Sequence, residues 1–119
     1  MDWHEWRNKT GDDAVILAVN GNIDGARAKF REIRDGAMEQ KDTEYRATCL
    51  LFLSGCELEA GFREESDADL EKALSIALEG HQKQPPKHES YKTADGRVFK
   101  AISAWEFIKI EKERRHARK

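Results

Sequence analysis

The sequence has no hydrophobic run long enough to cross a membrane. Its longest apolar runs, Ala14–Val19 and Cys49–Leu53, are far shorter than the roughly 20 residues that a transmembrane helix requires. The first residues, Met1-Asp2-Trp3-His4-Glu5, carry acid where a secretory signal carries base, and no long apolar segment follows them. We therefore exclude membrane insertion and expect a cytoplasmic protein.

Cysteine is scarce, with only Cys49 and Cys56 in 119 residues. Seven residues of helix would separate the two thiols by about 10.5 Å, which a disulfide cannot bridge. Their spacing also differs from that of a zinc site, and no partner histidines accompany them. We expect two small buried hydrophobic residues in a reducing compartment.

The sequence lacks the usual motifs of enzymes and metal sites. Its eight glycines occur singly, so there is no phosphate-binding loop, and no serine has the glycine neighbours of a nucleophile elbow. His4-Glu5 resembles the start of a zinc-protease motif, but Asn8 stands where the second histidine is needed. His81 and His88 are too loosely spaced to define a metal site. We expect no enzyme, catalytic residue, metal or cofactor.

The sequence does contain helical patterns, enough for one domain. Its acidic and basic residues are distributed unevenly along the chain. Charged residues make up 37% and hydrophobic residues 39%, so residues 1–119 form a single globular domain. Residues 1–80 hold 18 acids and 10 bases, whereas residues 81–119 hold 5 acids and 11 bases. Either the two parts attract each other within the fold, or the charged end of the chain binds a nucleic acid or an acidic partner.

The first part of the chain predicts a strap followed by two helices. Residues 1–10 form the strap, in which the indoles of Trp3 and Trp6 cover one end of the core. Thr10 and Asp13 fit a capping pattern, so the first helix should occupy about residues 12–20. Asn22 can cap a second helix. Its apolar stripe recurs every three or four residues, and the opposite face is solvated: the stripe is Ile23, Ala26, Phe30, Ile33 and Ala37, and the solvated face is Arg27, Arg31, Arg34 and Asp35.

A second pair of helices completes a core over residues 11–80. Asp42 opens the central helix, which is apolar nearly all round from Ala47 to Leu53 and ends at Gly61. Ser66 and Asp69 form another capping pattern, so the fourth helix should start after Ser66 and end at Gly80.

The remaining residues predict a loop, a β-hairpin and a last helix. Residues 81–90 contain both prolines and no apolar side chain, so they form an exposed loop. Residues 91–100 form a short β-hairpin, because Asp95-Gly96 suits a type I′ turn. Ser103 and Glu106 cap a helix over residues 103–117 that places Trp105 and Ile108 inward.

Residues 14–79 resemble two tetratricopeptide repeats. Gly21-Asn22-Ile23-Asp24-Gly25-Ala26, followed by Phe30 and Ile33, resembles the turn and second helix of one repeat. Leu50, Leu53-Ser54 and Ala60-Gly61 resemble the first helix and turn of the next, and Leu70, Leu74 and Ala77 its second helix. The turn glycines lie 40 residues apart where the family has about 34, and Glu57 stands where an aromatic residue is usual. The resemblance implies two stacked helical hairpins with a groove for a peptide or protein.

A second resemblance concerns the segment from Tyr91 to Phe99 and the helix after it. It is similar to hairpin-to-helix segments of small uncharacterised proteins of phages and mobile elements.

Three functions remain open. We favour a non-enzymatic protein-interaction module that binds a partner protein through Arg46, Glu57 and Glu59, with Trp3 and Trp6 as anchors, and that can form a homodimer. The first alternative is a small phage or mobile-element inhibitor of a host nucleoprotein or enzyme complex, whose acidic patch over residues 57–71 attracts a basic surface through Glu64, Glu65 and Asp67. The second alternative is nucleic-acid binding through Arg114, Arg115 and Arg118.

Overall fold

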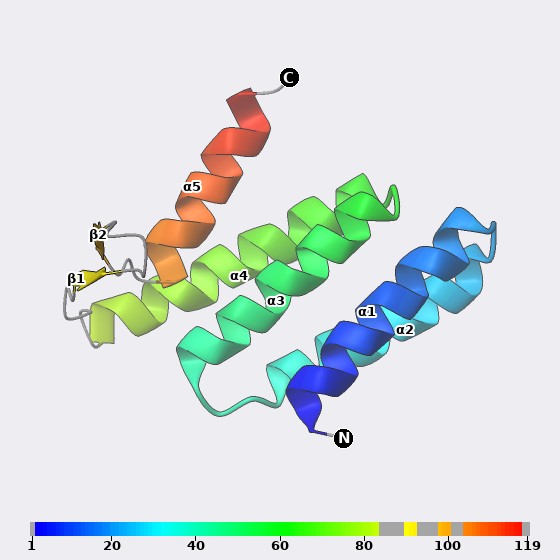
Figure 1. Ribbon diagram of the computed structural model, residues 1–119, viewed down its shortest axis with the longest axis horizontal. Coiled ribbons are helices and arrows are strands. Elements are labelled where there is room, and N and C mark those ends of the chain that lie inside the picture. Colours follow the sequence, from blue (N-terminus) through cyan, green and yellow to red (C-terminus); the bar gives the residue numbers. More distant parts are fainter. Residues whose placement is uncertain (1, 84–89, 93–97, 101–103, 118–119) are drawn as a thin grey trace.

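The computed structural model describes residues 2–83, 90–92, 98–100 and 104–117, and the protein is mainly helical. In chain order the elements are α1 (Trp3–Val19), α2 (Ile23–Met38), α3 (Thr43–Glu59), α4 (Arg63–Lys83), β1 (Ser90–Lys92), β2 (Val98–Lys100) and α5 (Ala104–Ala117). Figure 1 shows α1 beside α2 and α3 beside α4 as two antiparallel pairs, with α5 crossing α4 obliquely. Within the described part of the chain, no helix is long and apolar enough to cross a membrane.

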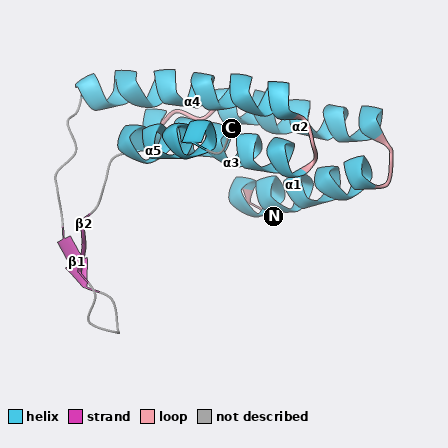
Figure 2. Cartoon of the chain, turned by 90° about the horizontal axis from the view of Figure 1, so that it is seen from above, coloured by secondary structure: helices cyan, strands magenta, loops and turns pink. Residues whose placement is uncertain are grey.

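The helices form two layers. Figure 2 shows α2 and α4 on one side of the molecule and α1, α3 and α5 on the other. The central position belongs to α3, which contacts all four other helices. Its side chains Leu50 and Leu53 are fully buried, together with Phe30 and Ile33 of α2 and Ile108 of α5. The apolar character of α3 on several sides follows from these neighbours.

The prediction of an N-terminal strap is wrong. Residues 3–10 belong to α1, which is capped by Asp2 and not by Thr10: the Asp2 side chain accepts a hydrogen bond from Glu5 N at 2.9 Å. Thr10 is buried inside the helix. The polar side chains of the first turns obscured a helical stripe that continues to the end of α1, namely Trp3, Arg7, Thr10, Ala14 and Ala18.

The caps of α2 and α3 are as predicted, and so is the stripe of α2 except at Ile23, which is 37% exposed at the first turn of the helix. Asn22 accepts a hydrogen bond from Gly25 N at 3.0 Å, and Asp42 accepts one from Tyr45 N at 2.8 Å. The predicted apolar stripe of α2 is buried at Ala26, Phe30, Ile33 and Ala37. Between α1 and α2 the chain turns at Gly21, whose φ of 89° favours glycine.

The predicted limits of α4 are wrong at both ends. The helix begins at Arg63, two residues after the positive-φ residue Gly61, so Ser66 and Asp69 lie within the helix and do not cap it. It also continues through Gly80 to Lys83, and therefore residues 81–83 are helix and not loop. An ideal Cβ at Gly80 would lie 3.1 Å from Thr43 Cγ2 of α3, so this glycine allows the two helices to approach closely.

The strands β1 and β2 pair antiparallel, with Tyr91 opposite Phe99. Asp95-Gly96, the predicted turn between them, lies outside the described residues, as does the predicted cap Ser103 of α5. The last helix begins at Ala104 and buries Ile108 against the core, as the sequence predicts.

Candidate functional site

A cluster of buried charges joins α2, α3 and α4. The Arg34 guanidinium donates from Nε to Asp69 Oδ1 at 3.0 Å and from Nη2 to Asp69 Oδ2 at 2.8 Å. Nη2 also donates to Glu57 Oε2 at 3.2 Å. The side chains of Glu57 and Asp69 are 0% and 6% exposed, and that of Arg34 is 29% exposed. The prediction that Arg34 is solvated is therefore wrong, because a carboxylate pair from the next hairpin covers it.

Glu57 carries the most strongly perturbed carboxyl group of this cluster. Burial raises its pKa to about 9, and the nearby Asp69 adds to the effect, while Arg34 acts in the opposite direction. Its Oε1 is buried without a hydrogen-bond partner among the described residues. The Arg34 pKa is raised, mainly by its hydrogen bond to Asp69. At neutral pH the cluster therefore holds one neutral acid beside an ion pair.

The buried cluster reaches the neighbouring hollow only through Arg34. A hollow of about 280 Å³ lies beside it, lined by Arg27, Phe30, Arg31, Arg34 and Glu65. Of the three cluster residues, only Arg34 reaches this hollow, and Glu57 is fully enclosed. A general acid must approach its substrate within hydrogen-bonding distance. What the arrangement can do is fix the position of α2 against α3 and α4.

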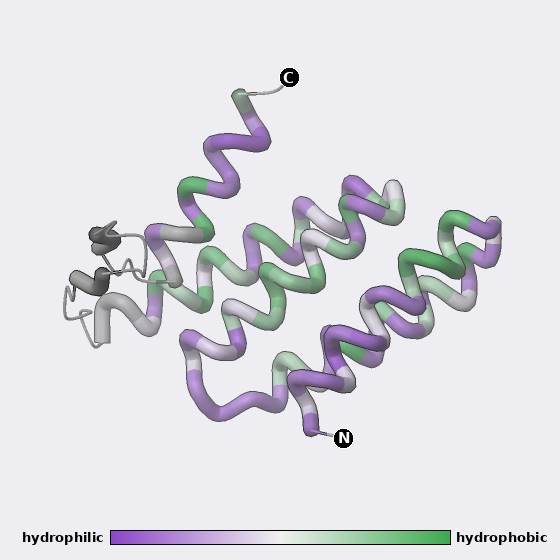
Figure 3. The backbone as a smooth tube through the Cα atoms, in the orientation of Figure 1, coloured by the Kyte–Doolittle hydropathy of each residue, from purple (hydrophilic) through white to green (hydrophobic). Residues whose placement is uncertain are grey.

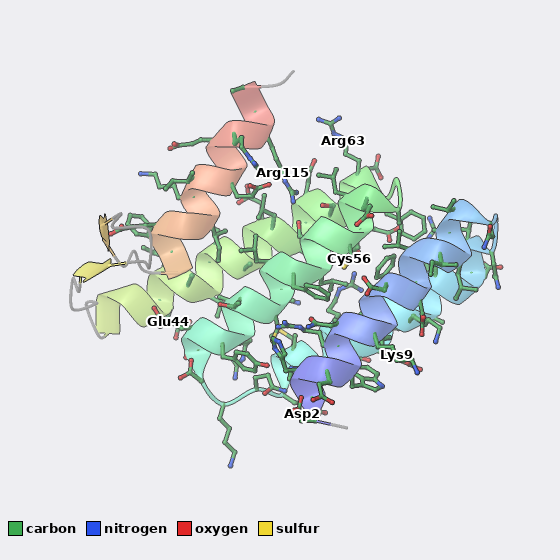
Figure 4. The ribbon with its side chains drawn as sticks, viewed as in Figure 1. Asp2, Lys9, Glu44, Cys56, Arg63 and Arg115 are labelled. Atoms are coloured by element: carbon green, nitrogen blue, oxygen red, sulfur yellow. The ribbon has the colours of Figure 1, made fainter. Side chains whose placement is uncertain are left out.

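A second polar contact anchors α5. Ser54 Oγ of α3 donates to the Ser66 carbonyl at 2.8 Å, and Ser66 Oγ of α4 donates to the Ser54 carbonyl at 2.6 Å. Arg115 of α5 then donates from Nη1 to Ser66 Oγ at 3.0 Å. Figure 4 shows Arg115 reaching from α5 toward α4. Both serines are fully buried, so their hydroxyl groups need these partners.

Arg7 is a buried cation between α1 and α3. Its Nη1 lies 3.4 Å from Cys49 Sγ, and its Nη2 lies 3.1 Å from Asn8 Oδ1. The guanidinium also stacks over the Phe52 ring, 4.6 Å from the centroid. Among the described residues no carboxylate pairs with it. Arg7 is 5% exposed, so it acts as a packing element and not as a surface contact.

The two N-terminal indoles belong to the edge of the core. Trp3 stacks on Trp6 with 5.1 Å between ring centroids, and both are partly buried against the core. A Cβ at Gly36 of α2 would lie 2.3 Å from the Trp3 ring, so the indole occupies the space that this glycine leaves. Trp3 and Trp6 therefore cover an end of the core and are partly exposed.

A cleft lies between α4 and α5. It has a volume of about 460 Å³ and is lined by Leu74, Trp105, Lys109, Lys112, Glu113 and His116. Leu74 and Trp105 supply an apolar floor, and Lys109 lies over the Trp105 ring at 5.3 Å. Lys112 pairs with Glu71, whereas Lys109 has no ion pair within the described parts of the chain. We call this region the α4–α5 cleft.

The far end of the first hairpin exposes apolar side chains among acids. Ile16 is 57% exposed, Val19 74% and Ile23 37%. Asp12 and Asp24 are exposed beside them, and residues 12–26 contain three acids and no base. Figure 3 shows the hydrophobic colouring of the last turns of α1 at this end. We call residues 12–24 the tip.

Most acids of the patch that the sequence predicts over residues 57–71 are buried or form ion pairs within the protein. Glu57 and Asp69 are buried, Glu65 pairs with Arg27 at 3.2 Å, Asp67 lies 3.7 Å from Arg115, and Glu71 pairs with Lys112. Only Glu59 and Glu64 are exposed without an ion pair to another described residue. The acidic and basic halves of the sequence therefore meet within one chain.

The other predicted contact residues are also engaged internally. Arg46 donates to the Gln40 carbonyl from Nε at 3.0 Å and from Nη2 at 2.6 Å, so it closes the α2–α3 turn. Arg114 and Arg115 both pair with Glu111. Arg118 lies outside the described residues. The assignment of Glu57 to a groove is wrong, because its side chain is fully buried.

Sequence reasoning missed Arg7, Arg34 and the α4–α5 cleft. The stripe of α1 could have revealed Arg7, since it lies four residues after Trp3 and three before Thr10. No comparable signal marks Arg34, because its partners come from other helices. The cleft depends on the crossing of α5 over α4, which periodicity does not encode.

Comparisons with protein families, with curated proteins and with solved structures found no match. Within residues that the structure describes, no group of three or more His, Cys, Asp or Glu side chains is placed to hold a metal ion. Cys49 and Cys56 are free thiols, buried as the sequence predicts.

Proposed function

We propose that the protein is a non-enzymatic protein-interaction module whose α4–α5 cleft binds an acidic, partly apolar segment of a partner protein. The observation that carries the proposal is the composition of this cleft. Its floor is formed by Leu74 and Trp105, and Lys109 stands at its rim without an ion pair in the described residues, with Glu113 and His116 beside it. A small apolar pocket with an unpaired lysine at its rim suits an apolar anchor that has a carboxylate beside it.

The helical arrangement is compatible with this role. We propose that the two hairpins stack as in tetratricopeptide repeats, with α5 covering the open end of the second hairpin. The alternation of layers supports this, since α1, α3 and α5 lie on one side and α2 and α4 on the other (Figure 2). Two repeats expose an open end that a further helix must cover. A cytoplasmic location accords with the two free thiols.

The acidic-patch and nucleic-acid alternatives have less support. A phage or mobile-element inhibitor acting through residues 57–71 would retain only Glu59 and Glu64 as free acids, because the other five are buried or paired. Nucleic-acid binding would have to use Arg114 and Arg115 while both are paired with Glu111. Both alternatives would need the internal ion pairs to open.

Peptide selection on the full chain tests the proposal. A displayed library of random peptides should enrich sequences that combine a leucine or aromatic residue with several acids. The selected peptides should bind at least about tenfold more weakly to a cleft variant, Lys109→Glu with His116→Glu, because the first change reverses a charge at the rim and the second adds a negative charge, and neither breaks a described ion pair.

The matched control is Lys41→Glu, an exposed lysine in the turn between α2 and α3. It should bind the selected peptides as the unchanged protein does. Enrichment of basic or uncharged peptides, or equal binding by the cleft variant, would contradict the proposal.

A further inference from the structure

We propose that the hollow beside the buried charge cluster binds a phosphate monoester, carried either by a phosphorylated side chain or by a small molecule. We call it the arginine hollow. It has a volume of about 280 Å³ and is lined by Arg27, Phe30, Arg31, Arg34 and Glu65. It shares no lining residue with the α4–α5 cleft, so the inference does not depend on the proposed function.

The three arginines of the hollow come from one side of α2. Arg27, Arg31 and Arg34 follow one another at intervals of four and three residues, which places them on the same face of the helix. Among the described residues that line the hollow, Glu65 of α4 is the single acid. Three positive charges and one negative charge give the lining a net charge of +2.

Arg31 is the free cation of the hollow. Arg27 pairs with Glu65 at 3.2 Å, and Arg34 pairs with the buried Asp69 at 2.8 Å. Arg31 is exposed and has no ion pair to another described residue. When both pairs are subtracted, Asp69 included, one positive charge remains, and it belongs to Arg31.

Arg34 adds donors that are already held in place. Its Nε and Nη2 donate to the carboxyl groups of Asp69 and Glu57, whereas Nη1 makes no hydrogen bond to another described residue. Because two carboxyl groups already order this guanidinium, an incoming anion loses little binding energy in ordering it. An anion in the hollow therefore accepts hydrogen bonds from Arg34 Nη1 and from the whole guanidinium of Arg31.

Two guanidinium groups at one small hollow suit a phosphate monoester. Guanidinium N–H groups bind phosphate oxygens in pairs, and a monoester offers three terminal oxygens and nearly two negative charges at neutral pH. A carboxylate has only two oxygens and one charge, which Arg31 alone can satisfy. Phe30 supplies the apolar part of the lining, against which the carbon atoms of the ester can pack.

A nucleic acid is a poorer fit to this surface. Its affinity depends on many phosphate contacts along an extended basic face. Here the unpaired charge is confined to Arg31, and the exposed acid Asp35 lies one turn further along α2, where it repels an extended polyanion.

An NMR titration of the full chain with phenyl phosphate tests the inference. The Nε–H signal of Arg31 should shift in a saturable manner at constant ionic strength. Phenyl sulfate has almost the same shape but a single negative charge, so it should bind at least about tenfold more weakly. Inorganic phosphate should compete with phenyl phosphate for the same site.

Substitutions at the lining should change the affinity in opposite directions. Arg31→Ala should weaken phenyl phosphate binding at least about tenfold, because it removes the unpaired guanidinium. Arg31→Lys keeps the charge but not the paired donors, so it should recover only part of the loss. Glu65→Gln removes the acid of the lining and releases Arg27, so it should bind phenyl phosphate more tightly.

Lys72→Ala is the matched control, because Lys72 is an exposed cation of α4 that does not line the hollow. It should bind phenyl phosphate as the unchanged protein does. Circular dichroism should show unchanged helical content in the Arg31 variants, since the side chain is exposed.

Peptides of mixed sequence with one phosphoserine or phosphotyrosine separate the two sources of the ester. If they bind at least about tenfold more tightly than phenyl phosphate, and Arg31→Ala removes this gain, the ligand is a phosphorylated protein. If they bind no better, it is a small phosphate ester.

Four outcomes would overturn the inference. These are an Arg31 signal that phenyl phosphate does not shift, equal binding by Arg31→Ala, equal binding of phenyl sulfate, and tighter binding of a single-stranded oligonucleotide than of any monoester. The last would indicate a nucleic-acid surface.

Discussion

Arg34 and Asp69, which are 35 residues apart in sequence, form an ion pair in which two guanidinium nitrogens contact both carboxylate oxygens. The pair joins α2 of the first hairpin to α4 of the second. Because Asp69 is 4% exposed, its carboxylate depends on this one cation, and the neutral Glu57 beside it is fully buried. The packing of the two hairpins against each other is therefore sensitive to the charge at three positions.

Removing the cation should destabilise the fold. Arg34→Ala leaves the Asp69 carboxylate buried without a counter-charge, which costs about 3–5 kcal/mol in fully buried pairs. Because the Arg34 side chain is 29% exposed, water compensates part of this, and we expect a loss of about 2–3 kcal/mol in the free energy of unfolding. Urea unfolding measures the change.

The matched control for that experiment is Arg31→Ala, on the same helix. Arg31 is exposed and has no ion pair within the described residues, so the change should stay within about 0.5 kcal/mol. Equal losses for the two variants would show that Arg34 contributes no more than a surface arginine.

Glu57 should make the protein less stable as the pH rises. Its carboxyl group titrates near 4.5 in the unfolded chain and at about 9 in the folded protein, so the folded state holds an extra proton between these values. The contribution of this proton to the free energy of unfolding is fully present below pH about 4.5. It is lost as the pH rises toward 9, at up to about 1.4 kcal/mol per pH unit. Glu57→Gln cannot lose a proton, so its stability should fall less between pH 5 and pH 9.

Urea unfolding of the unchanged protein and of Glu57→Gln across this pH range measures how steeply the free energy of unfolding of each falls with pH. Glu59→Gln is the control, since Glu59 is an exposed acid two residues away on the same helix. It should follow the pH dependence of the unchanged protein. A Glu57→Gln curve parallel to that of the unchanged protein would show that the buried carboxyl does not titrate in this range.

Two helical glycines should respond oppositely to alanine. Gly36→Ala places a Cβ 2.3 Å from the Trp3 ring, so the indole must move, and we expect a loss of about 1–3 kcal/mol together with altered tryptophan fluorescence. At Gly55 a new Cβ meets nothing within 4 Å, so Gly55→Ala should stabilise α3 by about 0.5–1 kcal/mol. Thermal unfolding measures both. A gain at Gly36 would mean that Trp3 does not pack against α2.

The cysteines should react with thiol reagents only after the protein opens. Cys49 is 0% and Cys56 7% exposed, and burial raises the pKa of Cys56 to about 11, so little thiolate forms at neutral pH. Labelling in native buffer should therefore be much slower than in denaturant and should accelerate as urea approaches the unfolding midpoint. Rapid labelling of either thiol without denaturant would contradict the packing of α3.

Most helices could be predicted from the sequence. Some of their ends could be predicted too, and others could not. Asn22 and Asp42 cap α2 and α3 as expected, because a cap is a local hydrogen bond within one turn. Ser66 matched the same capping pattern but lies inside α4, where Ser54 of α3 and Arg115 of α5 bind it. A serine in a helix can be either a cap or a buried contact, and only its tertiary neighbours distinguish the two.

The sequence by itself determined the apolar stripes, the central position of α3 and the burial of both cysteines. These features depend on residue type and on helical period, which act along one chain segment. Only the tertiary structure decided which charged residues are interior. Arg7, Arg34, Glu57 and Asp69 look solvated in the sequence, yet they are buried or partly buried because neutral or charged partners come from other helices. The α4–α5 cleft and the tip have the same origin, since the helix packing determines which side chains stay exposed.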